Sequence, residues 1–142
     1  MIEFVNTSNE PPYIELKKKY NQALETRQKN IEAIIISSYS KKLHEVNSRF
    51  VNLKFIDNNK FIFFSNYNSP KSIEFNDHSQ ITALLYWNNI NVQIRLKAYI
   101  KKTPKDFNNK YFLTRSNLKN ALAISSDQSE VIESYDQVQI NY

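Results

Sequence analysis

A period of two among the apolar residues is the feature that most constrains this sequence, because it predicts β-strands. It is clearest between residues 48 and 71, in the stretch SRFVNLKFIDNNKFIFFSNYNSPK. The apolar positions share one face of a predicted strand pair: Val51, Leu53, Phe55, Phe61 and Phe63. Asn58 and Asn59 separate the two runs and are of a residue type that tolerates the positive φ of a tight turn. The stretch therefore predicts a β-hairpin.

Polar residues distinguish this hairpin from an ordinary one. Arg49 lies at the start of the first strand and Lys54 at its far end, and further polar residues follow the second strand: Ser65, Asn66, Ser69 and Lys71. Ser69 and Pro70 are typical of the first positions of a helix, and a helix N-terminus favours an anion. We therefore expect cations, hydroxyls and amides to gather at one end of a small sheet, as a phosphorylated ligand requires.

Similar patterns predict the other elements of the chain. Strands are predicted at 31–39, 43–56, 61–65, 80–87 and 92–103, helices at 13–30, 70–77, 104–115 and 118–124, a strand-like end at 138–142 and a loose leader at 1–10. Because turns and short helices link the strands, we expect a mainly β (α+β) fold, a small antiparallel barrel with short flanking helices. A chain of 142 residues predicts a single domain, with the leader and first helix over 1–30 and the barrel over 31–142.

Composition excludes several kinds of site. The chain has no glycine, so it contains neither of the phosphate-binding motifs GxGxxG and GxxxxGK[ST]. It has no cysteine and two separated histidines, His44 and His78, so we expect no metal site. No apolar run approaches the roughly 20 residues that span a bilayer, and no signal peptide is apparent. We therefore expect a cytoplasmic protein without a membrane partner.

Arginine is scarce among the basic residues. Only 4 of the 19 lysines and arginines are arginine: Arg27, Arg49, Arg95 and Arg115. In a chain so rich in lysine, a position occupied by arginine is expected to use its planar, bidentate fork and not its charge alone.

Five segments together resemble a known family. They are RFVNLK (49–54), FFSN with SPK (63–71), LLYW with VQIRL (84–96), KYFLTR (110–115) and DQS (127–129). In this order and spacing, without a gap, they resemble the pyridoxamine 5′-phosphate oxidase family, whose members are homodimers with an FMN-binding split β-barrel. The resemblance implies an FMN-dependent oxidoreductase that transfers hydride between the flavin and a small, possibly phosphorylated molecule. The flavin carries this chemistry, so no catalytic side chain is implied.

The resemblance also implies roles for residues of this chain. Arg49 would meet the FMN phosphate, and Lys54 would lie between the flavin and the substrate phosphate, which Tyr111 and Arg115 would grip. FMN would lie at the homodimer interface. The residues implied in FMN binding are Arg49, Phe50, Val51, Asn52, Leu53, Lys54, Phe64, Ser65, Lys71, Gln93, Gln128 and Ser129.

The chain departs from the family pattern at three places. Pro70 stands where the family has a second arginine, which removes one contact to the FMN phosphate. Lys119 stands where the family has a serine in the substrate-phosphate grip. The family's C-terminal tryptophan and Arg-x-His segment have no counterpart before Tyr142. We therefore expect flavin binding with feeble or no oxidation of pyridoxamine 5′-phosphate.

Other interpretations remain open. The protein could hold a flavin or haem without turnover. A net charge of +5 with nine tyrosines and nine phenylalanines would also suit single-stranded nucleic acid, but the aromatic residues from Phe61 follow a core-like alternation, so we expect no nucleic-acid partner. Arg49 and Lys71 could be solvated ends of a strand and a helix, Tyr111 could pack its helix onto the barrel, and Trp87 is expected in packing or at a dimer interface.

Overall fold

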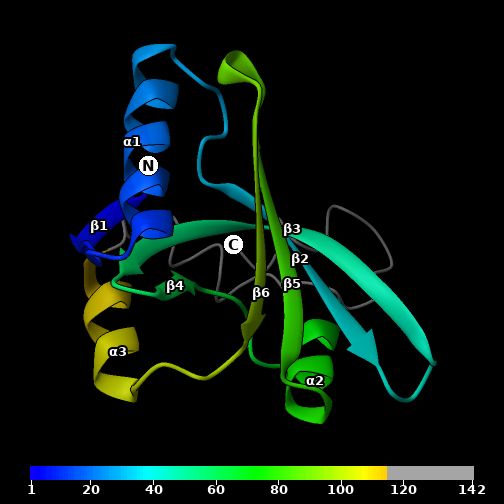
Figure 1. Ribbon diagram of the computed structural model, residues 1–142. Helices are drawn as coiled ribbons and strands as arrows, with labels where there is room; N and C mark the ends of the chain where they lie inside the picture. Colours follow the sequence, from blue (N-terminus) through cyan, green and yellow to red (C-terminus); the bar gives the residue numbers. More distant parts are fainter. Residues whose placement is uncertain (115–142) are drawn as a thin grey trace, which may run out of the picture.

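The computed structural model describes residues 1–114, and its strands confirm the predicted β-rich pattern (Figure 1). The predicted helix at 118–124 and strand-like end at 138–142 lie outside the described residues. The elements are β1 (Glu3–Asn6), α1 (Pro11–Glu25), β2 (Ala33–Ser40), β3 (Glu45–Asp57), β4 (Lys60–Phe63), α2 (Pro70–Asp77), β5 (Gln80–Trp87), the 3₁₀ turn η1 (Asn88–Ile90), β6 (Val92–Tyr99) and α3 (Lys105–Thr114).

The six strands form a mostly antiparallel sheet in the order β1-β3-β2-β5-β6, with β4 paired to β3. β3 is central because its two halves have different neighbours. Residues 45–52 pair with β2, and the rest of the strand pairs with β4 and, in parallel, with β1. Figure 1 shows β3 curving across the molecule, so that the hairpin of β5 and β6 and the pair of β3 and β4 run in different directions.

A β-bulge in β3 changes which side chains are buried. The pairing with β4 shifts register between Leu53 and Phe55, so Lys54 is an extra residue on β3. Past the bulge, Ile56 is buried and Phe55 is only half-buried. The expectation that Phe55 continues the buried face of Val51 and Leu53 is therefore wrong, because one extra residue reverses the alternation.

The first ten residues are not the loose leader that the sequence predicted. Residues 3–6 form β1, which pairs with the end of β3, and Ile2 is buried in the core. The backbone N–H of Ile2 donates a hydrogen bond to the Tyr20 hydroxyl at 2.8 Å. A four-residue strand is too short to give a recognisable period, but the far half of β3 offers it an edge to pair with.

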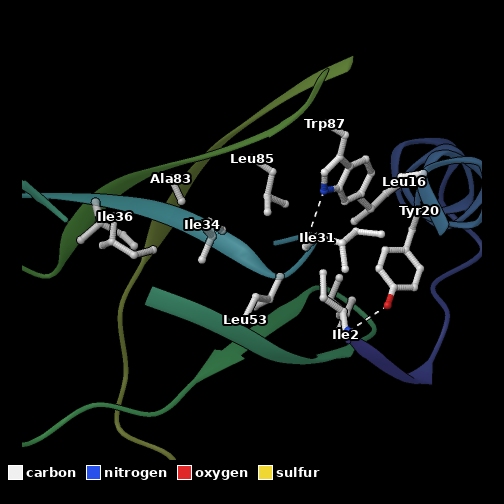
Figure 2. Close-up of a cluster of buried hydrophobic side chains, with 13 residues drawn as sticks. Ile2, Leu16, Tyr20, Ile31, Ile34, Ile36, Leu53, Ala83, Leu85 and Trp87 are labelled. Atoms are coloured by element: carbon white, nitrogen blue, oxygen red, sulfur yellow. Dashed lines mark hydrogen bonds between the residues drawn. The ribbon is translucent and has the colours of Figure 1, made fainter. Parts of the chain in front are cut away.

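The hydrophobic core lines the inner face of the curved sheet, and α1 covers the end of the core at Trp87 (Figure 2). Trp87, which is 1% exposed, ends β5 there and donates its indole N–H to the carbonyl of Ile31 at 3.0 Å. Its ring centroid lies 5.9 Å from that of Tyr20. This confirms the packing role expected for Trp87. None of the helices within residues 1–114 is long and apolar enough to cross a membrane.

Asparagine takes the place of glycine at several tight turns. Asn58, in the predicted β3–β4 turn, has φ 54°, and Asn30 and Asn91 have φ 51°. Between β5 and β6, Asn88 and Asn89 form a 3₁₀ turn, and the left-handed residue is Asn91. Short polar side chains tolerate this region better than most, so the fold needs no glycine there.

Candidate functional site

The best-defined polar cluster lies where α2 packs against β2 and β3. The Nη2 of Arg49 donates to Oε2 of Glu74 at 2.9 Å, and its Nη1 donates to the hydroxyl of Ser38. Ser38 in turn donates to the same carboxylate oxygen. Asn47 donates to the other oxygen, Oε1, at 2.9 Å. We call Ser38, Asn47, Arg49, Lys71 and Glu74 the Arg49 cluster.

Strand alternation and register bring these residues together. In β2, alternate residues from Ile34 to Ser40 are buried, so Ser38 points inward. Ser38 lies opposite Asn47 in β3, and Arg49 is its diagonal neighbour on the same face. The buried Glu74 of α2 meets this face, where it contacts Ser38, Asn47 and Arg49. A strand pair therefore supplies the arginine, and a helix supplies the carboxylate.

Glu74 is held as a buried carboxylate. Its side chain is 8% exposed, and that of Arg49 is 23% exposed. Burial acts to raise the pKa of Glu74, but the hydrogen bonds from Ser38, Arg49 and Asn47, together with the charge of Arg49, outweigh it and hold the pKa below its ordinary value. The alternative that Arg49 is a solvated strand end does not fit this burial.

Lys71 lies near Arg49 without a counter-ion. Burial lowers the pKa of the Lys71 ammonium, and the positive charge of Arg49 lowers it further. Within residues 1–114, Lys71 forms neither an ion pair nor a side-chain hydrogen bond. The predicted gathering of two cations is therefore observed for Arg49 and Lys71, and it leaves one half-buried charge uncompensated in this part of the chain.

The loop before α2 contains a further unsatisfied group. Ser69 and Ser72 both donate to the carbonyl of Asn66, at 2.7 and 2.9 Å. Ser69 thus occupies the predicted N-cap position, but its hydroxyl bonds back to the loop and does not cap the helix. The hydroxyl of Ser65 is buried and has no hydrogen-bond partner among the described residues. Such groups are rare in folded proteins and call for an explanation.

Lys54 lies apart from this cluster. Burial acts to raise the pKa of Glu32, but a backbone hydrogen bond, the N-terminal amine at 3.5 Å and the positive charge of Lys54 outweigh it and lower the pKa. Five residues of extended strand separate Lys54 from Arg49, roughly 16 Å. The structure therefore places Lys54 beside the start of β2 and not beside Arg49 and Lys71.

The segment 49–54 does not present all of its side chains to one ligand. Arg49, Val51 and Leu53 point to the inner face, where Leu53 is fully buried. Phe50 and Asn52 are exposed on the outer face. The side chain of Leu53 is enclosed by the core and its backbone N–H donates to the carbonyl of Glu32 at 2.8 Å, so neither is available to a ligand.

Aromatic rings pack α3 onto the barrel. The rings of Phe64 and Tyr111 are stacked, with centroids 3.7 Å apart and planes 4° apart. Phe55 meets Phe64, Phe107 and Tyr111 edge-on, and the ring of Phe107 lies parallel to that of Phe64. The packing interpretation of Tyr111 is thus confirmed, and its stacking partner is Phe64, which the resemblance assigned to FMN.

The remaining predicted site residues lie elsewhere or beyond the description. Gln93 is exposed on β6, opposite Tyr86 of β5. Arg115, Lys119, Gln128 and Ser129 lie outside the described residues. Within residues 1–114, no three histidine, aspartate or glutamate side chains are placed to hold a metal ion.

Sequence reasoning missed three members of the Arg49 cluster, Ser38, Asn47 and Glu74. One signal was available for Ser38: in the strand predicted at 31–39, it continues the alternation of Ile34 and Ile36, so a polar side chain occupies a buried position. A buried polar residue needs a partner. The spacing of Lys71 and Glu74, three residues apart on one helix, was a second and weaker signal.

A groove of about 450 Å³ also opens beside α1, between Thr7 and residues 14–25. It is open to solvent and lined largely by exposed side chains such as Lys17, Lys18 and Glu25. Among the residues that the structure describes, the buried hydroxyl without a partner is that of Ser65, which does not line this groove, so we place the candidate site at the Arg49 cluster.

Comparison with solved structures identifies the fold class. PhzG from Burkholderia lata, in complex with tetrahydrophenazine-1-carboxylic acid, superposes with a TM-score of 0.84 and 21% identity, covering 96% of this chain and 66% of that one. A pyridoxamine 5′-phosphate oxidase-related, FMN binding protein from Nostoc punctiforme gives a TM-score of 0.69 and 11% identity, covering 93% and 72%. The fold is therefore the predicted split β-barrel of this group, a mixed α+β fold with a mostly antiparallel sheet.

Curated relatives identify the family. The chain is 32% identical over 123 residues to pyridoxine/pyridoxamine 5′-phosphate oxidase of Nostoc punctiforme, covering 87% of this chain and 57% of that protein. It is 29% identical over 121 residues to the chloroplastic oxidase 1 of Arabidopsis thaliana, covering 85% and 23%. A search against models of protein families found no match. The resemblance to the pyridoxamine 5′-phosphate oxidase family is confirmed, and the chain spans 57% and 23% of the length of these two relatives.

Proposed function

We propose that this protein binds FMN through its phosphate at Arg49 and Lys71 and acts as a flavin-dependent oxidoreductase on a small molecule. One observation carries the proposal. Lys71 is half-buried beside Arg49, its pKa is lowered by burial and by that like charge, and it has no counter-ion within residues 1–114. A phosphate monoester would supply the missing negative charge.

The other groups nearby fit a phosphate. The buried hydroxyl of Ser65 lacks a partner among the described residues and lies in the loop that leads to α2. The guanidinium of Arg49 carries more N–H donors than its contacts to Glu74 and Ser38 use. Pro70 supplies no charge or donor here, so the phosphate would depend on these two cations and this hydroxyl.

The role of the protein in such a reaction is to bind and orient. A bound flavin supplies the capacity to accept or donate hydride, and the protein determines where the ring lies and what reaches it. The relatives named as oxidases support oxidoreductase chemistry. The alternative, flavin binding without turnover, would use the same phosphate site but would have no substrate.

The outer face of the sheet supports a homodimer, which we propose as the assembled form. Phe50 is 71% exposed there and lies opposite Ile35, which lies opposite Leu84 on the next strand. This row of apolar side chains crosses β3, β2 and β5. Tyr86 and Tyr99 are also exposed on the same face. An apolar row of this kind on a sheet face is typical of a surface that a partner covers.

Light scattering tests the dimer. We expect the wild-type protein to have twice the mass of one chain, and Phe50→Glu to shift it toward the monomer, because a carboxylate is costly in an apolar interface. Exposed Lys60→Glu in the β3–β4 hairpin is the control for an added carboxylate and should remain dimeric. A monomeric wild-type protein would refute the proposal.

Parallel titrations with FMN and riboflavin test the phosphate site. We expect FMN to bind more tightly than riboflavin, and Arg49→Ala to weaken FMN binding about 10- to 100-fold while riboflavin is little changed, since a hydrogen bond to a charged group contributes about 1.5–3 kcal/mol. Arg49→Lys keeps the charge beside Glu74, and should fold and lose affinity partially. Lys41→Ala, in the β2–β3 turn, is the control. Equal affinity for the two flavins would refute the site.

A further inference from the structure

Glu74 is a buried carboxylate that no part of the proposed phosphate contact uses. Both of its oxygens are occupied: Oε2 accepts from Arg49 and Ser38, and Oε1 accepts from Asn47. A carboxylate beside a phosphate-binding arginine has a cost, because it repels the phosphate. Its presence therefore calls for a compensating role.

The geometry indicates what that role is. Glu74 holds Nη2 of Arg49 and Ser38 holds Nη1, so two points fix the plane of the guanidinium. Ser38 is itself oriented, because its hydroxyl receives from Arg49 and donates to Glu74. Asn47 fixes the carboxylate from its other side. The orientation of the remaining N–H donors of Arg49 is therefore fixed before a ligand binds.

Without these contacts, Arg49 would lose conformational freedom only when a ligand bound. A long arginine side chain has much rotamer freedom to lose, and fixing it in advance reduces the cost of binding. Arg49 and Lys71 are neighbouring positive charges that repel each other. When no anion is bound, the carboxylate of Glu74 neutralises one of them, Arg49. Both effects favour a folded site that is ready for an anion.

We propose that Glu74 is a positioning residue of the phosphate site: with Ser38 and Asn47 it fixes the guanidinium of Arg49, so that the site discriminates phosphorylated from unphosphorylated flavin. This inference rests on the proposed function, because it assigns a role to Arg49 at the phosphate. Glu74 contacts Arg49 and does not need to touch the ligand.

The test compares FMN with riboflavin for three variants of α2. We expect Glu74→Ala to raise the Kd for FMN about tenfold and leave that for riboflavin unchanged, because about one hydrogen bond to a charged group is lost. Glu74→Gln should lose at most about threefold, since its amide oxygen still accepts from Arg49 while Asn47 turns its own amide to accept from the new NH₂. Asp77→Ala removes an exposed carboxylate from the same helix and should change neither constant.

If Glu74→Ala does not fold, Asn47→Ala replaces it. This variant keeps the ion pair but frees Oε1 of Glu74, and we expect a smaller loss for FMN, about threefold, with riboflavin again unchanged. An equal loss for both flavins would show a structural role, and tighter FMN binding in Glu74→Ala or Glu74→Gln would show competition for Arg49. Either result would overturn the inference.

The outcomes separate this inference from the proposed function. If Arg49→Ala abolishes the preference for FMN while the Glu74 and Asn47 variants retain it, the phosphate site stands and the positioning role fails. If the wild-type protein shows no preference for FMN, the proposed function fails, and the positioning role fails with it.

Discussion

At the α1 end of the molecule, the buried polar groups beside Trp87 have hydrogen-bond partners within the core. The indole of Trp87 donates to Ile31, and the hydroxyl of Tyr20 accepts from Ile2. At the α2 end, Arg49 and Glu74 are paired, but Lys71 has no counter-ion and Ser65 no partner within residues 1–114. The first region has the features of a core that stabilises the fold, and the second has polar capacity left for a ligand. We expect changes in the two regions to have separable effects.

The largest expected effect is that of Trp87→Ala on stability. Removing this buried ring should lower the free energy of unfolding by about 3–5 kcal/mol, measured by urea denaturation. Trp87→Phe keeps much of the volume and loses the bond to Ile31, so its loss should be smaller. The FMN affinity of the protein that remains folded should be unchanged. A fall in FMN affinity as large as that for Arg49→Ala would show that the two regions are coupled.

Lys71→Met is expected to have smaller effects: it should weaken FMN binding and stabilise the ligand-free protein. FMN affinity should fall about tenfold, because a charge-assisted contact is lost. The ligand-free protein should melt at a higher temperature, since a half-buried charge beside Arg49 has been removed. The lowered pKa of Lys71 gives the sign: the destabilisation is present while Lys71 is protonated and disappears as pH rises toward its ordinary value of 10.5.

Lys41→Met, at an exposed position in the β2–β3 turn, is the control and should change neither property. A lower melting temperature for ligand-free Lys71→Met would contradict the assignment of Lys71 to a region held ready for a ligand.

The smallest expected effect is on the acid limb of stability. The pKa of Glu74 lies below its ordinary value of 4.5 because hydrogen bonds from Ser38, Arg49 and Asn47 outweigh the opposing effect of burial. The stabilisation from Glu74 is therefore complete above pH 4.5 and is lost as pH falls through the lower, folded-state pKa. Urea unfolding at a series of pH values should show a shallower acid decline in Glu74→Gln. Identical slopes would show that Glu74 does not titrate on unfolding.

Most of the strands were predictable because their signal is local. The strands predicted at 31–39, 43–56, 80–87 and 92–103 correspond to β2, β3, β5 and β6, and in β6 Val92, Ile94 and Leu96 are half-buried while Gln93, Arg95 and Lys97 are exposed. The β3–β4 turn was predictable from Asn58 for the same reason. β1 was missed because four residues carry little period, and the bulge at Lys54 was missed because nothing in the local pattern marks an extra residue.

The candidate site was predictable in part. Arg49 and Lys71 were identified, with Ser65, from polar residues that break the pattern and from a family resemblance, and the structure brings the two cations together. Lys54 was expected in the same site and lies by Glu32, because the bulge and the length of β3 separate it from Arg49.

The sequence alone determined most of the strands, the β3–β4 turn at Asn58, the cations Arg49 and Lys71, and the family. These depend on period, on residue type or on the order of short motifs, which neighbouring residues define. Only the tertiary structure decided that Arg49 meets Glu74, 25 positions away, that Ser38 links the two, and that Tyr111 stacks on Phe64. The reason is physical: whether a carboxylate becomes the partner of an arginine depends on which face of α2 packs against β2, and that is decided by the packing of whole elements.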